Sequence, residues 1–180
     1  MKSVKILDCK LLIFLILSAI ISCTEKANVQ NPQTGEIAIN PDFSSVPGQL
    51  AGQILDEYFG IKNALIEDND SRARESAENL AKLVASNPEL KIFQEQLDHI
   101  LETGEVRHQR QHFQKLSDLV YLLISEVGGH TVVVYKQYCG MAFGNTGAFW
   151  LSASEEVINP YFGTKMLNCG SVQEKLEIKL

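Results

Sequence analysis

Residues 105–129 read EVRHQRQHFQKLSDLVYLLISEVGG, and the spacing of their apolar residues decides the fold class. Apolar residues recur along this stretch at heptad spacing, which is typical of one buried face of a long helix. They are Val106, Phe113, Val120 and Val127. The pair Gly128-Gly129 indicates where the helix ends, because glycine readily takes the left-handed conformation of a helix C-cap. The stretch therefore predicts a helix from about Glu105 to Val127.

Three earlier stretches show the same kind of period. The first predicted helix begins near Pro47, the second is capped by Asp70, and the third opens with Asn87 as a cap and Pro88 in the first turn. The residues expected to be buried on these three helices are Leu50, Ile54, Tyr58, Ile61 and Leu65; Ala73, Ala77, Leu80 and Val84; and Leu90, Phe93, Leu97 and Ile100. Four amphipathic helices with short joins predict an antiparallel four-helix bundle.

The pattern changes after Gly129. Residues 131–135 (TVVVY) and 148–151 (AFWL) are rich in β-branched and aromatic residues, which predicts two strands. The residues between them, 139–147, are rich in glycine and predict a turning loop. Residues 152–160 are expected to open with one helical turn that Asn-Pro ends. The sequence thus predicts a mainly α protein with a small, loop-rich β extension at its C-terminus.

The N-terminus predicts export. Three lysines among the first ten residues precede an apolar run, residues 11–21, which suits a signal peptide and is short for a membrane span. The run ends in Ile-Ser-Cys23, which resembles the lipobox of bacterial lipoproteins. We expect residues 1–22 to be a lipoprotein signal peptide and Cys23 to carry the lipid; the alternative is an ordinary cleaved signal. Thr24 is similar to residues that send lipoproteins to the outer membrane, facing the periplasm.

The rest of the chain is expected to be a tether and one domain. Residues 23–46 contain two prolines and many small polar residues, which predicts a flexible tether before a single domain over residues 47–180. Loss of residues 1–22 removes three lysines and one aspartate, so the formal charge goes from −6 to −8. An acidic chain without a cluster of lysine and arginine argues against nucleic acid as a partner. No nucleophile elbow or phosphate-binding loop is present, and we expect no enzyme.

Four sulfur-containing residues lie in two short segments of the predicted extension. Cys139 is followed by Met141, and Met166 is followed by Cys169. Thiolates and thioethers are soft donors that prefer Cu(I), and the spacing does not match the paired C-x-x-C pattern of zinc sites. If Gly140 and Gly170 let both segments bend, the four sulfur atoms can surround one ion. The pattern favours copper(I) over zinc.

A disulfide is the alternative for the same cysteines. Exported proteins form disulfides, and Cys139 and Cys169 are the only cysteines of the predicted domain. Closing that loop would stabilise the domain by about 3–4 kcal/mol in the chain-entropy account. Met141 and Met166 would then be core residues. The sequence leaves both possibilities open.

The histidines add a third type of donor. His108 and His112 lie four residues apart on the long predicted helix and therefore project from one face, as in helical metal sites. The same face continues into leucines, so a hydrogen-bonded, partly buried role is the alternative. For His99 and His130 we expect surface or capping roles.

A longer pattern resembles a known family. Residues 135–172, YKQYCGMAFGNTGAFWLSASEEVINPYFGTKMLNCGSV, and the segment from Arg110 to Ser117 with its R-x-H-F-x-x-L-S pattern, are similar to a bacterial domain of unknown function. That domain occurs in exported stand-alone proteins and at the C-terminus of heavy-metal efflux periplasmic adaptor proteins of the copper/silver type. One position differs, because Gly140 stands where the family usually has proline.

The resemblance implies a set of metal ligands and a partner. The implied ligands are His112, Cys139, Met141, Met166 and Cys169. Copper is the implied ion, and a heavy-metal efflux adaptor or transporter is the implied partner. We therefore expect a lipid-anchored envelope protein that binds Cu(I) and buffers it or hands it to efflux. The alternative is a disulfide-stapled structural or interaction module without a metal role.

Overall fold

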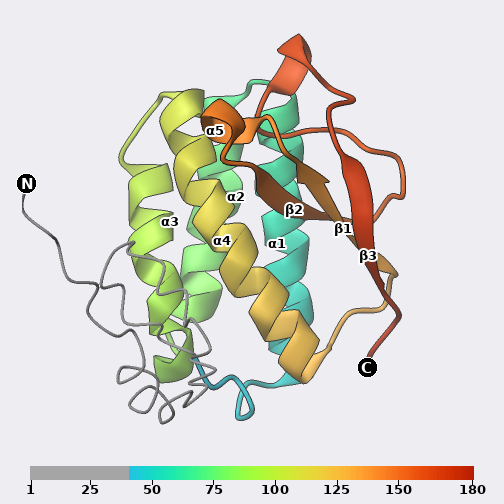
Figure 1. Ribbon diagram of the computed structural model, residues 1–180. Helices are drawn as coiled ribbons and strands as arrows, with labels where there is room; N and C mark the ends of the chain where they lie inside the picture. The colour runs from blue at the N-terminus through green and yellow to red at the C-terminus, as the bar shows by residue number, and fades with distance from the viewer. Residues whose placement is uncertain (1–40) are drawn as a thin grey trace, which may run out of the picture. The chain divides into compact units, whose positions relative to one another are not determined.

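The computed structural model describes residues 41–180. The expected signal peptide, Cys23 and most of the expected tether lie outside the described residues. Four helices come first in the described part: α1 (Gly48–Ile66), α2 (Asp70–Val84), α3 (Gln94–Leu101) and α4 (Val106–Val127). A three-stranded sheet follows them (Figure 1). The prediction of a mainly helical protein with a small β extension is confirmed.

The helices share one hydrophobic core. Helix α1 packs against α2 and α4, and α3 packs against the same two helices. The apolar faces predicted from the sequence face this core, and their central residues, such as Ile54, Leu97 and Val120, are fully buried. Each such side chain contributes about 1.5–3 kcal/mol relative to an exposed position. None of the helices in residues 41–180 is both long and apolar enough to cross a membrane.

Two helix starts differ from expectation. Asn69, and not Asp70, is the N-cap of α2, because its side chain accepts a hydrogen bond of 3.0 Å from the backbone N–H of Arg72. Asn87 accepts from the N–H of Glu89 as expected. The segment after it, however, is first a 3₁₀ helix, η1 (Pro88–Phe93), and becomes the α-helix α3 only at Gln94.

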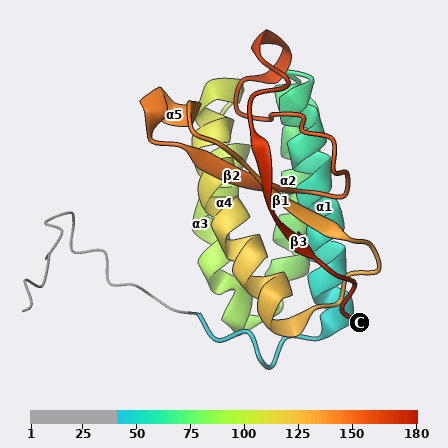
Figure 2. The same ribbon diagram turned by 45° about the vertical axis from the view of Figure 1, so that its right-hand side comes forward.

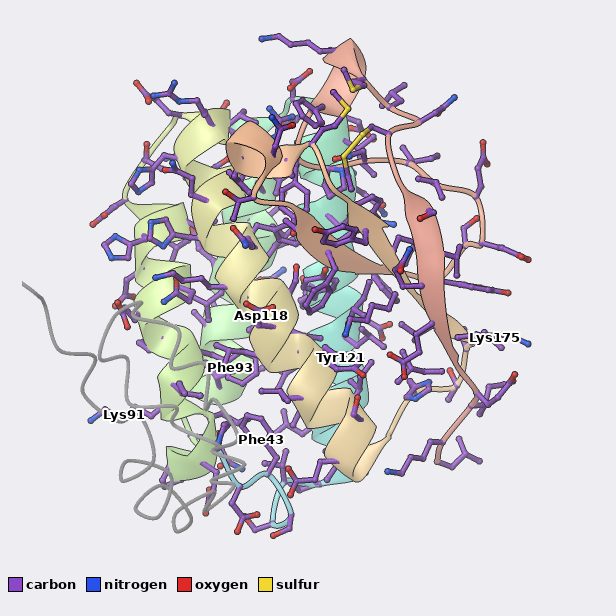
Figure 3. All side chains as sticks on the ribbon, viewed as in Figure 1. Phe43, Lys91, Phe93, Asp118, Tyr121 and Lys175 are labelled. Atoms are coloured by element: carbon purple, nitrogen blue, oxygen red, sulfur yellow. A yellow bond between two sulfur atoms is a disulfide. The ribbon has the colours of Figure 1, made fainter. Side chains whose placement is uncertain are left out.

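Burial begins before the predicted domain start at Pro47. Phe43 is fully buried and Val46 nearly so. The ring of Phe43 lies 6.0 Å from that of Phe93, and both residues are labelled in Figure 3. The N–H of Phe43 also donates to the carboxylate of Glu126, at 3.2 Å. Residues 43–46, which the sequence predicts to be part of the tether, therefore belong to the packed structure.

The sheet consists of β1 (Val134–Cys139), β2 (Ala148–Ser152) and β3 (Ser171–Leu176), in the antiparallel order β2-β1-β3. Strand β2 is as predicted. Strand β1 begins three residues later than expected and continues through polar residues, because as the central strand it is paired on both edges. Strand β3 was not predicted, since it is mostly exposed and shows no apolar alternation.

The helical turn expected from Ser152 is not formed. Ser152 ends β2, and the backbone that follows is held by Gln137 of β1. The buried amide of Gln137 donates to the carbonyl oxygens of Ser154, Glu155 and Glu156, at 2.9, 3.2 and 3.1 Å. These carbonyl groups are therefore satisfied by a side chain rather than by helical hydrogen bonds.

The sheet lies against α1 and α4, and α3 lies on the opposite side of the helices (Figures 1 and 2). Tyr58 of α1 joins the two layers. Its hydroxyl is fully buried, accepts from the backbone N–H of Leu151 at 2.9 Å, and shares a hydrogen bond of 2.8 Å with Ser117 of α4.

Replacing Tyr58 by phenylalanine is expected to destabilise the protein by about 1–3 kcal/mol, because the buried N–H of Leu151 loses its acceptor. Urea unfolding of Tyr58→Phe measures this loss. Tyr121→Phe is the matched control, since the hydroxyl of Tyr121 bonds an exposed carboxylate, Glu174. Equal free energies of unfolding for the two variants would contradict the bridging role of Tyr58.

Candidate functional site

The structure brings the two cysteines together. Cys139, the last residue of β1, and Cys169, just before β3, are joined by a disulfide with their Cα atoms 5.8 Å apart. The sulfur atoms of the described residues gather at one end of the molecule (Figure 3). We call Cys139, Met141, Met166 and Cys169 the sulfur end. The pairing is the disulfide alternative that the sequence left open.

The two methionines of the sulfur end are not core residues. Met141 is 52% exposed and Met166 is 40% exposed, whereas Cys139 between the strands is buried. The expectation that a disulfide would leave the methionines as packing residues is therefore wrong. Their thioether groups lie at the surface beside the cysteine pair.

Asn159 holds the segment that carries Met166 and Cys169. The side chain of Asn159 is fully buried and donates to the carbonyl oxygen of Cys169 at 2.7 Å. Its backbone N–H donates to the carbonyl oxygen of Leu167, also at 2.7 Å, and its side-chain oxygen accepts from the N–H of Tyr161 at 2.8 Å. The sequence marked Asn159 only as the end of a turn, so this role was missed.

The glycines at the sulfur end differ in what they do. Gly170 has φ of 146°, and a side chain there would meet the carbonyl oxygen of Tyr138 at 2.8 Å. Glycine is therefore required where the segment enters β3. Gly140 is not in the left-handed region, and a Cβ there would make only an ordinary contact of 3.7 Å. The backbone at Gly140 therefore does not require glycine.

Arg110 of α4 fastens the segment between β2 and β3 to the helices. Its guanidinium donates to the carbonyl oxygens of Pro160 and Leu65, at 2.6 and 2.7 Å, and to the carboxylate of Asp68 at 2.6 Å. Asp68 also accepts from the hydroxyl of Thr164, at 2.6 Å, and Thr164 is the middle residue of η2 (Gly163–Lys165). The Thr164 hydroxyl, followed by the guanidinium, keeps the pKa of Asp68 below its usual value.

His112 belongs to a different group from the sulfur end. It lies on the face of α4 that packs on α3, and its ring stacks on that of His99 with centroids 4.2 Å apart. The ring of His108 lies 4.8 Å from that of His112. Phe113, the next residue, faces Tyr161 on the side of the sheet, and successive helical residues point about 100° apart. The contacts of His112 are therefore with His99, His108 and Gln96, and none of these residues belongs to the sulfur end.

One ring nitrogen from each of His99, His108 and His112 lies within 4.8 Å of the others, and all three side chains are half-buried. We call these residues the histidine cluster; it contains no cysteine. His108 and His112 project from one face as predicted. The side chain of His99 is 39% exposed, as expected for a surface residue, but its place beside these two rings was not predicted. Burial, together with the neighbouring His99 and His108, lowers the pKa of His112.

Hydrogen bonds orient two rings of the cluster. Nδ1 of His99 lies 2.6 Å from the carboxylate of Glu102, and Nδ1 of His112 lies 2.9 Å from the amide oxygen of Gln96. Nε2 of His108 is buried and has no hydrogen-bond partner among residues 41–180. The cluster thus combines two hydrogen-bonded rings with one unsatisfied nitrogen.

His130, by contrast, is not the surface residue that the sequence predicts. It is 2% exposed, and its Nδ1 lies 2.8 Å from the carbonyl oxygen of Val132. A cavity of about 440 Å³ lies beside it, between the start of α1 and residues 129–132. His130 lies in the connection between α4 and β1, and its backbone pairs with that of Lys179.

Comparison with known proteins identifies part of the chain. Residues 54–131 match the sequence model of a family described as "Protein of unknown function (DUF3347)". The chain contains a domain of unknown function. The match runs from α1 to just before β1, less than half of the 180 residues, so it includes the histidine cluster and excludes the sulfur end. Searches of curated proteins and of solved structures found no match.

Proposed function

We propose that the protein is a lipid-anchored protein of the bacterial cell envelope that binds Cu(I) at the sulfur end and buffers it or hands it to heavy-metal efflux. The observation that carries this proposal is the exposure of Met141 and Met166 beside the cysteine pair. Packing does not explain two exposed thioethers at such a position, whereas transfer of a soft ion between proteins requires accessible soft donors.

The oxidation state of the cysteines sets the number of donors. A thioether binds Cu(I) without losing a proton, so Met141 and Met166 offer two donors even when the disulfide is closed. A dithiol reductant converts the disulfide to two thiols, and their thiolates then add Cys139 and Cys169 as ligands. Because Cys139 is buried, the ion enters from the side of the methionines. His112 is not part of this proposed shell.

The remaining parts of the proposal rest on the sequence. The resemblance to domains attached to copper/silver efflux adaptors supports copper as the ion and an efflux adaptor or transporter as the partner. Cys23 would hold the protein on the outer membrane, facing the periplasm. In this proposal the four helices serve as an antiparallel four-helix bundle, a rigid support that displays the sulfur end.

An anaerobic Cu(I) titration against a competing chelator tests the site. With the reduced protein, we expect Met141→Ala and Met166→Ala each to weaken Cu(I) binding by about tenfold, or about 1.4 kcal/mol, because each removes one donor. Leu167→Ala is the matched control, since Leu167 is 38% exposed in the same segment and carries no donor. A double methionine variant that binds Cu(I) as tightly as the wild type would remove the thioethers from the site.

A second function has an observation in its favour. The closed disulfide, with Cys139 buried, favours a stapled structural or interaction module of an envelope or efflux assembly. In that case, protein isolated from its own envelope is fully oxidised and holds no copper, and reduction does not create Cu(I) binding. Intact mass with and without alkylation, together with metal analysis of the isolated protein, separates the two functions.

A further inference from the structure

We propose that His99, His108 and His112 bind a divalent transition-metal ion of the zinc type between α3 and α4. This site is separate from the sulfur end and does not depend on the proposed Cu(I) function. It joins a ligand from α3 to two ligands from α4, so the bound ion would link these two helices.

The spacing of the three rings fits one ion. His108 and His112 are one helical turn apart on α4, and α3 packs alongside with His99 stacked on His112. The ring nitrogens lie within 4.8 Å of one another. In a tetrahedral site with zinc–nitrogen distances of about 2.0 Å, ligand nitrogens lie about 3.3 Å apart. Half-buried side chains can close this difference by rotating about their own bonds, without movement of the helices.

The neighbours of the cluster leave lone pairs for an ion. A carboxylate and an amide oxygen are acceptors, so the hydrogen bonds to Glu102 and Gln96 require the proton on Nδ1 of His99 and of His112. The lone pair of each ring is then on Nε2, where a metal can bind. Carboxylate and amide oxygens behind metal-bound histidines are the usual outer partners that fix ring orientation.

An independent observation points to a ligand. Nε2 of His108 is buried without any hydrogen-bond partner in the described part of the chain. A buried nitrogen in that state is unfavourable, because it has lost its hydrogen bond to water and has not formed another. Coordination of an ion would satisfy it, whereas the aromatic contacts with His99 and His112 do not.

The donor set selects the class of ion. Three imidazoles suit Zn²⁺, Cu²⁺ or Ni²⁺, whereas Mg²⁺ and Ca²⁺ prefer oxygen donors and Cu(I) favours sulfur. Three protein ligands leave a fourth position for water or for a donor from another molecule. The cluster is therefore suited to reversible binding, and Zn²⁺ is the appropriate probe.

The experiment is a Zn²⁺ titration of the full chain, with its disulfide closed, in competition with a chromophoric chelator. We expect one equivalent to bind and each of His99→Gln, His108→Gln and His112→Gln to weaken binding by at least about tenfold. Gln111→Ala is the matched control on the exposed face of α4, and its affinity should equal that of the wild type. Met141→Ala should also leave Zn²⁺ binding unchanged, which separates this site from the sulfur end.

A second measurement does not depend on variants that fold. Titration of the wild type with Zn²⁺, followed by NMR of the histidine ring protons, should shift the signals of His99, His108 and His112 together and leave that of His130 in place. Wild-type binding no tighter than that of the His99→Gln variant, or shifts confined to other residues, would overturn the site.

Discussion

Reduction of the disulfide between Cys139 and Cys169 is expected to lower the free energy of unfolding by about 3–4 kcal/mol. The two cysteines are 30 residues apart in sequence, so the bond removes a large loop-closure entropy from the unfolded chain. In the folded state it joins β1 to the start of β3. Urea unfolding with and without a dithiol reductant measures the difference.

The Cys139→Ser/Cys169→Ser double variant is the control for this measurement. Its stability should be lower than that of the oxidised wild type and should not respond to the reductant. If the unfolding midpoint of the wild type also does not change when reductant is added, the disulfide does not constrain the unfolded chain.

The same measurement bears on the proposed Cu(I) site. A ligand that binds only the folded state raises stability, so Cu(I) should restore part of the stability lost on reduction. The double serine variant lacks both thiolates, so the part of this stabilisation by Cu(I) that depends on them should be absent. An equal response of both proteins to Cu(I) would indicate that the cysteines are not ligands.

Replacement of Lys62 by methionine is expected to raise the free energy of unfolding by about 2 kcal/mol at pH 7. Lys62 of α1 is only 8% exposed, and its ammonium group makes one hydrogen bond, of 3.3 Å, to the hydroxyl of Ser152. Among the described residues no carboxylate lies within ion-pair distance of it. Burial lowers the pKa of Lys62 from 10.5 to about 8. Methionine fills a similar volume without a charge, so the cost of burial disappears and one hydrogen bond is lost.

The direction of the pH dependence follows from that shift. The unfolded chain binds the proton of Lys62 more tightly than the folded protein, so between about pH 8 and 10.5 the stability of the wild type rises with pH. The advantage of Lys62→Met should therefore shrink by about 2 kcal/mol from pH 7 to pH 9.5. Measurements should stop below pH 10. Burial raises the pKa of Tyr58 in the folded protein, so above pH 10 this tyrosine loses its proton first in the unfolded chain, which lowers stability.

Lys82→Met provides the comparison for Lys62→Met. Lys82 is exposed on α2, and its replacement should change stability by less than about 0.5 kcal/mol at any pH in this range. A difference between wild type and Lys62→Met that stays constant from pH 7 to pH 9.5 would show that Lys62 is charged and solvated in the folded protein.

The helical part of the fold was predictable, because a helix that buries one face must carry apolar residues at a regular spacing, and this spacing is visible in the local sequence. The heptad positions from Val106 to Val127 and the glycine pair after them gave α4 within one residue. The errors occurred where a side chain replaces backbone hydrogen bonds or where a strand carries little apolar signal. After β2 the side chain of Gln137 bonds carbonyl oxygens that a helical turn would have used, and the mostly exposed β3 has no pattern to detect.

The candidate sites were predictable only in part. Helical spacing placed His108 and His112 on one face, but it contained no information that α3 would bring His99 beside them. Arg110 was visible only as a member of a family-like pattern, and Asn159 was visible as the predicted end of a turn. The hydrogen bonds of Arg110 fix the segment between β2 and β3 against the helices and connect residues distant in sequence. Asn159 bonds within that segment, to the carbonyl oxygen of Cys169.

The sequence by itself determined the helices and their buried faces, and it identified the four sulfur residues as a group, because these properties depend on residue type and local spacing. The tertiary structure alone decided three further matters: that Cys139 and Cys169 are paired, that Met141 and Met166 remain at the surface, and that His112 turns away from them toward His99. Each of these depends on which helix or strand packs against which, and packing joins residues whose separation along the chain carries no signal of their contact.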